Sequence, residues 1–240
     1  MECDPEDKLG LITIDYAPGA NENAIVAILL CPGSSEYKAN PQHPAAGITG
    51  SHLQTLMQKI KDRLKKDPQE LRCLKADDFT YNKRTARGGI MVANVFENWY
   101  GKESPNGRMP PKRPSCEDVK RLRGRIAGTK KLILCFGAVA AECWDMVIKC
   151  GIEMRDFVVV KCCHLGNKGL NNCINVDENG EIIVTGGNNR NKQKENVSKR
   201  LAVLANYILG CVAGVVDVPL ACYLNKLKQE CKCCSCKGEP

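Results

Sequence analysis

Four short, continuous apolar runs constrain the fold of this chain more than any other sequence feature. The runs are AIVAILL at 24–30, GIMVANVF at 89–96, KLILCF at 131–136 and FVVVKC at 157–162. Uninterrupted apolar runs of this length are typical of strands buried on both faces of a parallel sheet. Segments with helical spacing separate the runs. The sequence therefore predicts an α/β fold, with three α/β/α layers around a central, mostly parallel four-stranded sheet.

Local signals indicate where the helices begin. Ser51 is the expected N-cap of a helix whose apolar spacing continues to Leu64. Ser115, with Asp118 three residues later, is typical of a capping box. The remaining expected elements are a helix that opens at 137–138, a short hairpin around 177–180 and a last helix over about 194–209.

Length and charge bound the organisation of the chain. Its 240 residues suit one domain over 1–210 and a basic, Cys-rich C-terminal extension over 211–240. Lys and Arg number 35 against 27 Asp and Glu, which gives a net charge of +8. This excess favours an anionic partner, although many basic proteins bind no nucleic acid.

Sixteen cysteines raise the question of disulfides or metal. The acidic opening Met1–Asp7 lacks the apolar core of a signal peptide, and no apolar run reaches the ~20 residues of a membrane span. We therefore expect a cytoplasmic protein with no membrane contact and with cysteines that are mostly reduced core residues. The cluster at Cys231–Cys236 suits either a soft metal or a disordered basic tail, and no metal is assigned.

Ligand sites in open α/β sheets lie beyond the carboxyl ends of the strands. The residues that directly follow the four apolar runs are therefore the candidates for a functional site. They lie at 31–46, 94–98, 137–138 and 164–171.

Four stretches at these junctions carry a resemblance. They are CPGSSE (31–36) with PAAGITG (44–50), ANV (93–95) with PNGR (105–108), LILCFGAVAA (132–141) and VKCCHLGN (160–167). In this order they resemble the motifs of the uracil-DNA glycosylase superfamily, and most of all those of its short, thermophilic-type branch. The resemblance covers about residues 25–171 and implies a uracil-DNA glycosylase-like fold.

The chain departs from that pattern at several positions. Two of the four cysteines that hold an iron–sulfur cluster in the branch fall on Asn98 and Leu122, so we expect no cluster and no other cofactor. The catalytic acid of the first motif falls near Leu30, and the aromatic residue that stacks on uracil falls near Ala45. The closing motif has Leu165–Gly166 in place of Pro-Ser.

The resemblance implies a monofunctional DNA glycosylase, a monomer that hydrolyses the N-glycosidic bond of a base flipped out of DNA. Such an enzyme needs a donor for the departing base and a group that positions water. His164 is the expected donor, and Asn94 is expected to read the base edge or to support hydrolysis. Glu36 is the best remaining carboxylate for water. The alternatives are a structural His, a turn-forming Asn and a solvated Glu.

The remaining expected site residues divide into two groups. The substrate-binding group is Cys31, Pro32, Gly33, Ser34, Ser35 and Ala45. The DNA-binding group is Leu165, Gly166, Asn167, Lys168, Asn171 and Arg108. Leu165 or Leu170 is the expected wedge that fills the vacated base stack. An ordinary turn is the alternative for both groups.

A small residue at Ala45 indicates a roomier pocket than uracil needs. This favours a bulky modified pyrimidine of phage DNA as the substrate, and hence a role in anti-phage defence. Three alternatives stay open: uracil excision in base-excision repair, a non-catalytic reader of flipped bases, and an unrelated nucleotide-binding α/β enzyme. The chain lacks the glycine fingerprint of the last class.

Overall fold

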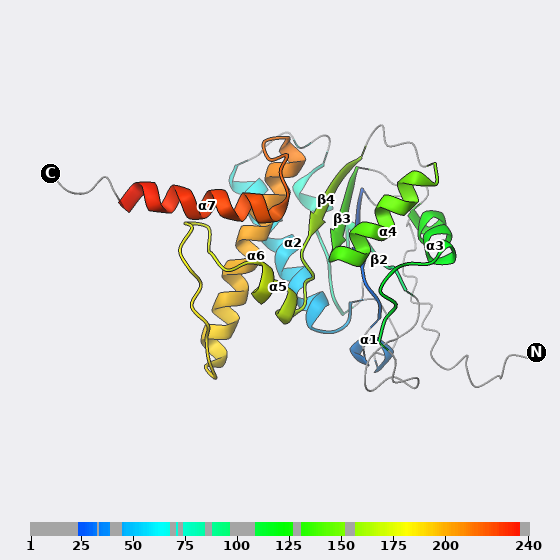
Figure 1. Ribbon diagram of the computed structural model, residues 1–240, viewed down its shortest axis with the longest axis horizontal. Coiled ribbons are helices and arrows are strands. Elements are labelled where there is room, and N and C mark those ends of the chain that lie inside the picture. The colour runs from blue at the N-terminus through cyan, green and yellow to red at the C-terminus, as the bar shows by residue number, and fades with distance from the viewer. Residues whose placement is uncertain are drawn as a thin grey trace, which may run out of the picture.

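Four parallel strands form the centre of the protein, as the four apolar runs predict (Figure 1). The strands are β1 (Ile25–Leu29), β2 (Ile90–Asn94), β3 (Leu132–Phe136) and β4 (Val158–Cys162). They lie in the order β2-β1-β3-β4, and each neighbouring pair is parallel. The computed structural model describes residues 24–32, 34–38, 45–67, 71, 74–84, 88–96, 109–126, 131–151 and 157–235.

Burial distinguishes the edge strand β4 from the other three. Every residue of β1, β2 and β3 is buried, whereas Val158 and Val159 are only half-buried and Lys161 is exposed. The Lys161 ammonium lies 2.7 Å from the Asp145 carboxylate of the neighbouring helix. A lysine on an edge strand discourages pairing with another chain.

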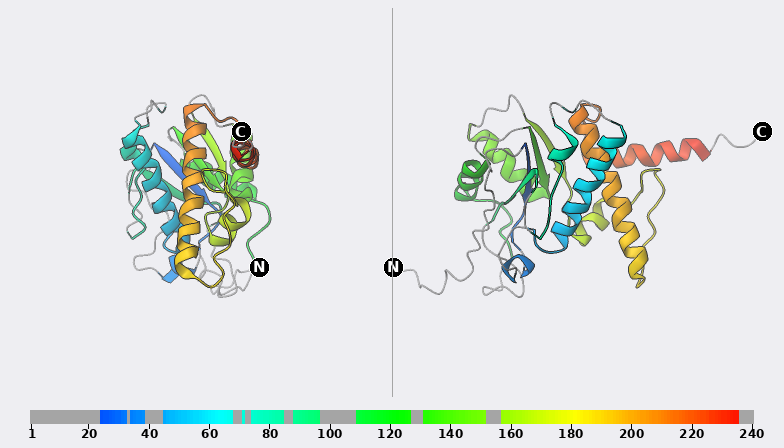
Figure 2. Two further views of the ribbon diagram at one scale, coloured as in Figure 1. Left: turned by 90° about the vertical axis from the view of Figure 1, so that its left-hand side faces the viewer. Right: turned by 180° about the vertical axis from the view of Figure 1, so that it is seen from behind.

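Two helical layers enclose the sheet (Figures 1 and 2). One layer is α3 (Cys116–Ile126) with α4 (Ala138–Lys149); the other is α2 (Ile48–Lys66), α5 (Asn167–Cys173) and α6 (Arg190–Ala213). Alternate strand residues supply the two cores: Val26 and Ile28 face α3 and α4, whereas Ala27 and Leu29 face α2 and α6. The fold is thus α/β with an all-parallel central sheet.

The strand order creates a switch point between β1 and β3. From β1 the chain passes through α1 (Ser34–Lys38) and α2 to β2 on one side. From β3 it passes through α4, on the opposite face, to β4 on the other side. Neighbouring strands whose connections diverge leave a crevice at their carboxyl ends, and ligands of α/β proteins bind there.

Helix starts follow the sequence signals only in part. The Ser115–Asp118 capping box is confirmed, since the Ser115 N–H donates to Asp118 Oδ2 (2.8 Å) and the Asp118 N–H donates to Ser115 Oγ (3.2 Å). The expectation that Ser51 caps α2 is wrong, because that helix begins at Ile48 with Gly47 as its N-cap. The Ser51 N–H instead donates to the Gly47 carbonyl within the first turn.

The C-terminal part contains more helix than the sequence predicts. α6 extends over 190–213, beyond the expected 194–209 and across residue 210, with Asn189 as N-cap and Gly214 in the left-handed conformation as C-cap. A further helix, α7 (Leu220–Ser235), was not predicted; its Leu220 and Leu224 join the core on the α6 side. α7 projects from the body (Figure 1). The expected hairpin exists as one bridge, between Val176 and Ile182.

The cysteines divide between core and surface. Cys135, Cys143, Cys162 and Cys163 are buried, as expected, whereas Cys116, Cys150, Cys173 and Cys222 are exposed. Burial raises the pKa of the Cys135 and Cys143 thiols to about 12, so both are protonated and unreactive at neutral pH. Among the described residues, no three His, Cys, Asp or Glu side chains are grouped for a metal ion, and no helix is both long and apolar enough to cross a bilayer.

Candidate functional site

His164 lies two residues beyond β4 and has a defined tautomer. The Gly166 N–H donates a 2.9 Å hydrogen bond to Nδ1 of His164, so Nδ1 presents a lone pair. Burial lowers the pKa of His164 below its ordinary value, which keeps the ring neutral at pH 7. The single ring proton therefore resides on Nε2. His164 is a neutral hydrogen-bond donor at the carboxyl edge of the sheet.

Three glycines enclose the His164 residue. A Cβ on Gly169 of α5 would lie 2.3 Å from the His164 carbonyl oxygen, and one on Gly166 would lie 3.0 Å from Nδ1. Gly137 follows β3 and is the N-cap of α4, with φ +103°. A Cβ added to Gly137 would lie 3.6 Å from the His164 Cβ. The imidazole is thus held between the end of β3 and the start of α5, beside the switch point.

A second histidine, the buried His52, anchors the same segment. Nδ1 of His52, on α2, lies 2.6 Å from the Leu165 carbonyl oxygen. Sequence reasoning missed His52, although it belongs to the helical stripe of Leu53, Leu56 and Ile60 that faces the core. The helical spacing of His52 with these core residues was the signal that could have identified it. Its contact with the Leu165 carbonyl fixes the position of the chain next to His164.

The wedge role expected for the closing segment is wrong. The side chains of Leu165 and Leu170 are fully buried in the core on the α2 and α6 side, so neither can enter a base stack. Asn167, Lys168 and Asn171 are exposed at the surface of α5. The resemblance suggested a loop here, but the chain forms a short helix.

Asn94 ends β2 and is 5% exposed. Its Oδ1 atom is buried and has no hydrogen-bond partner among the residues that the structure describes. A buried acceptor without a partner is unfavourable, and native proteins rarely keep one without a functional reason. The parity of Ile90 and Val92 puts Asn94 on the α2 face of the sheet. Its amide is suited to receive a donor from a ligand.

Asn94 and His164 stand at opposite ends of the strand order. β2 and β4 are separated by three strand spacings, roughly 14 Å at about 4.8 Å each. The switch point between β1 and β3 lies between them.

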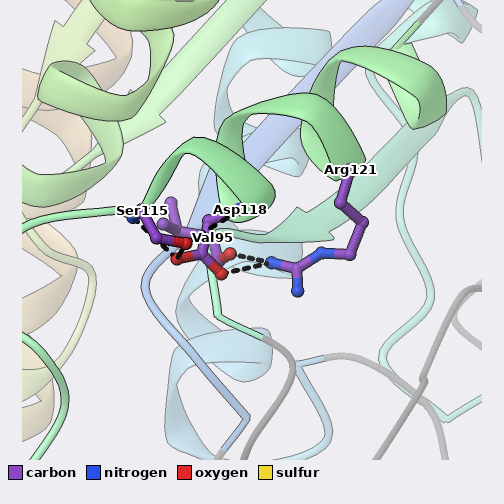
Figure 3. A network of polar contacts seen from close by, with 4 residues as sticks. All are labelled: Val95, Ser115, Asp118 and Arg121. Carbon is purple, nitrogen blue, oxygen red and sulfur yellow. Dashed lines mark hydrogen bonds and ion pairs between the residues drawn. The ribbon is translucent and has the colours of Figure 1, made fainter.

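The exit of β2 is held by α3 (Figure 3). Arg121 donates from Nη2 to the Val95 carbonyl, directly after Asn94, and the same nitrogen lies 3.2 Å from Asp118 Oδ1. Asp118 also caps α3 through Ser115. Arg121 therefore positions the backbone beside Asn94.

Glu36 is the only buried carboxylate among the described residues and is 7% exposed. Its Oε1 accepts a 2.5 Å hydrogen bond from the Ala45 N–H. Ala45 has φ +54°, the only positive value at a described non-glycine residue. Gly50 of α2 permits this turn, because a Cβ there would lie 1.5 Å from the Ala45 carbonyl oxygen. Glu36 thus fixes the segment that leads into α2.

Ala45 does not open the pocket that its small size indicated. The residue is 2% exposed and its side chain joins the hydrophobic core rather than a cavity. Tyr81, missed by sequence reasoning, is buried on the same face of the sheet. The pKa of Tyr81 is raised, mainly by burial and further by the negative charge of Glu36. An aromatic side chain is therefore present near the Glu36 carboxylate.

The other expected substrate-binding residues follow β1. Cys31 is half-buried, Pro32 is buried and Ser34 is half-buried, while Ser35 is exposed. Ser35 lies against Gly47 at the start of α2, where an added Cβ would be 3.1 Å from its Oγ. Gly33, Arg108 and Asn98 lie outside the described residues, and Leu122 is fully buried in α3.

The geometry thus brings His164, Asn94 and Glu36 to the same edge of the sheet, each with a different local role. In comparisons with known proteins, no family model, no curated protein and no solved structure matches the chain significantly.

Proposed function

We propose that the protein is a monofunctional DNA glycosylase with a uracil-DNA glycosylase-like fold. It binds a base flipped out of DNA, hydrolyses the N-glycosidic bond and leaves an abasic site. The observation that carries the proposal is the neutral, fixed His164 donor on the same strand edge as the unsatisfied Asn94 acceptor. Such a pair complements a pyrimidine edge that has a carbonyl beside an N–H.

His164 acts on the leaving group in this proposal. As the bond between C1′ and the base nitrogen breaks, the base takes the electron pair and negative charge builds on its carbonyl oxygen. The Nε2–H of His164 stabilises that charge, and the fixed tautomer means that no reorganisation is needed. Water then adds to C1′, and its proton is passed to the departing base or to solvent.

Asn94 and Glu36 complete the proposed site. Asn94 Oδ1 receives the base N–H, which gives this buried acceptor its missing partner. The negative charge of the Glu36 carboxylate stabilises the positive charge that develops on the sugar, as carboxylates do in glycoside cleavage. Because its Oε1 already holds the Ala45 N–H, Glu36 also positions the segment between α1 and α2.

The substrate is a damaged or modified pyrimidine in DNA. Uracil and a bulky modified pyrimidine of phage DNA are the two candidates, with repair and anti-phage defence as the corresponding roles. The buried position of Ala45 takes away the argument that favoured the bulky base. The donor–acceptor pair fits either candidate.

Purified protein incubated with uracil-containing DNA and, separately, with phage DNA that carries hypermodified cytosine tests the proposal. Abasic sites are then converted to strand breaks by alkali and resolved on a gel. We expect alkali-dependent breaks in one of the two DNAs, lost in His164→Ala and Asn94→Ala and kept in Asn175→Ala, a control at an exposed asparagine. Breaks without alkali would contradict a monofunctional enzyme.

A non-catalytic base reader is the second candidate. It is favoured by the half-buried, apolar Leu30 at the position of the family's acid and by the engagement of Glu36 Oε1 with Ala45. A reader binds the modified DNA tightly, releases no base, and loses affinity when Asn94 is replaced. The same gel assay, combined with a binding measurement, separates the two candidates.

A further inference from the structure

Three cavities along α6 form a continuous groove that no part of the proposed reaction uses. Their volumes are about 430, 480 and 430 Å³. The first and second share Thr55 and Ser198, and the second and third share Asn167, Gln193 and Val197. We call this the α6 groove. Its walls are α2 and α5, and α2 runs beside α6 along its length (Figure 2).

The charge of the α6 groove has one sign. Its described lining contains Lys59, Arg190, Lys194 and Arg200 and no Asp or Glu. Arg200 is 5% exposed and donates from Nε to the Ile174 carbonyl, so its charge is fixed in place. Most other polar lining residues carry amides or hydroxyls, which bond phosphate and sugar oxygens readily.

The one acidic residue of α6 lies outside the groove lining. Glu195 pairs with Lys199, four residues along the helix, at 3.0 Å, and neither residue lines the groove. The α6 positions that line it are 190, 193, 194, 196, 197, 198, 200 and 201. Because α6 contains five Lys and Arg residues and one Glu, the helix is basic as a whole, and its single carboxylate is not part of the groove.

Residues that line the α6 groove are close in the chain to His164. Asn167, which lines two of its cavities, directly follows Gly166, whose N–H holds His164. Ile48 and His52, near the start of α2, line the same central cavity. The N-terminal end of α6 reaches the sheet edge at which the chain enters α1 and α2 (Figure 1). A strand with one base at His164 thus has its neighbouring phosphates at the mouth of the groove.

We infer that the α6 groove binds the sugar–phosphate backbone of the DNA strand next to the extruded base. The inference rests on the proposed function for its ligand and adds the path of the strand. Lys59, Arg190 and Lys194 neutralise successive phosphates, while the amides contact sugar and phosphate oxygens without reading sequence. The groove determines the affinity of the protein for DNA, and the His164 site determines which base is bound.

Binding of plain DNA tests this path separately from catalysis. The probe is a short fluorescein-labelled oligonucleotide without uracil or modified bases, measured by anisotropy between roughly 50 and 200 mM salt. We expect Arg190→Gln with Lys194→Gln to weaken binding at least tenfold at the lower salt and to reduce the slope of log K against log salt by about 1.5, as two lost phosphate contacts require.

A matched double variant controls for net charge. Lys120→Gln with Lys149→Gln removes two exposed charges from α3 and α4, in the opposite layer. It is expected to keep the affinity and the slope of the unchanged protein. Equal losses in the two double variants, or displacement of the probe by poly-glutamate as effectively as by unlabelled DNA, would overturn the groove as a DNA-backbone site.

The two proposals fail separately. If plain DNA binds through Arg190 and Lys194 but no base is released from any DNA, the groove stands and the glycosylase proposal falls. If a base is released and the Arg190→Gln, Lys194→Gln protein binds with an unchanged salt slope, the glycosylase stands and the groove inference is wrong.

Discussion

The N–H of Gly166 and Nδ1 of His164 are joined by a 2.9 Å hydrogen bond that decides where the proton of the imidazole lies. Because Nδ1 accepts, Nε2 carries the hydrogen and points a donor away from the backbone. A change that protonates Nδ1, or that removes the acceptor, therefore changes the chemistry of the site directly.

The pH dependence of excision follows from this bond. Burial lowers the pKa of His164, so the ring becomes charged only below its ordinary value of about 6.5. We expect the acidic limb of the kcat/KM profile to have a midpoint below pH 6.5, since protonation breaks the Gly166 bond. His164→Asn, which keeps an acceptor for Gly166, is expected to lower kcat by about 100-fold. A midpoint at or above pH 6.5 would contradict this assignment.

The titration of His164 is expected to lower the stability of the protein at acidic pH, just as it lowers excision. The unfolded chain binds a proton near pH 6.5 while the folded chain resists it, so the free energy of unfolding falls as the pH drops below about 6.5. In His164→Asn this part of the fall is expected to disappear. Urea unfolding of both proteins across that range measures the difference, and parallel curves would show that His164 titrates alike in the two states.

Two buried asparagines provide a comparison of function with stability. Within the described part of the chain, Asn94 Oδ1 has no hydrogen-bond partner, whereas Asn196 Nδ2 donates to the Val184 carbonyl at 2.8 Å. We expect Asn94→Ala to change the free energy of unfolding by less than about 1 kcal/mol, because relief of an unsatisfied acceptor offsets lost packing. Asn196→Ala is expected to cost about 0.5–1.5 kcal/mol.

At saturating DNA, excision should show the reverse order, with Asn94→Ala inactive and Asn196→Ala active, because Asn196 lines the α6 groove and not the His164 site. Denaturant unfolding and the gel assay on the same preparations measure the two properties. If Asn94→Ala proved to be the more destabilised protein by several kcal/mol, Asn94 would have a structural role.

Gly169, which packs against the backbone of His164, is not expected to tolerate a side chain. Gly169→Ala places a Cβ 2.3 Å from the His164 carbonyl oxygen, so the backbone must shift, at a cost of about 1–3 kcal/mol and with loss of excision. Gly124→Ala in α3 meets nothing within 4 Å and is expected to stabilise the protein by about 0.5–1 kcal/mol. Thermal unfolding of both variants checks the contrast; similar melting temperatures would count against it.

Asp118 contacts both Ser115 and Arg121, whereas the Ser115 side chain contacts only Asp118. Substitutions at the two positions should therefore differ in their effects on stability and excision. Ser115→Ala removes both hydrogen bonds of the Ser115 hydroxyl to Asp118 and is expected to cost about 1 kcal/mol. Asp118→Ala also releases Arg121, which holds the Val95 carbonyl beside Asn94, and is expected to cost about 1.5–3 kcal/mol. Only Asp118→Ala is expected to reduce excision as well. Equal effects on stability and activity would mean that Arg121 does not position Asn94.

Much of the architecture was predictable because it depends on residues that are close together in the sequence. Continuous apolar runs predicted the four strands, and the Ser115–Asp118 spacing predicted its capping box. The same reasoning failed where contacts are distant. The start of α2 depends on the approach of Gly50 to Ala45, and α7 depends on a hydrophobic surface that receives Leu220 and Leu224. Neither partner is visible in the residues nearby.

For the site, the positions of His164 and Asn94 after strands were predictable, because the period and length of the apolar runs indicate where each strand ends. What those side chains can do depends on contacts that form only in the folded protein. The tautomer of His164 is set by Gly166, the isolation of Asn94 Oδ1 by the burial around it, and the unavailability of Leu165 as a wedge by the core. Strand positions follow from local hydrophobic patterns, whereas protonation, hydrogen bonding and exposure depend on residues that only folding brings together.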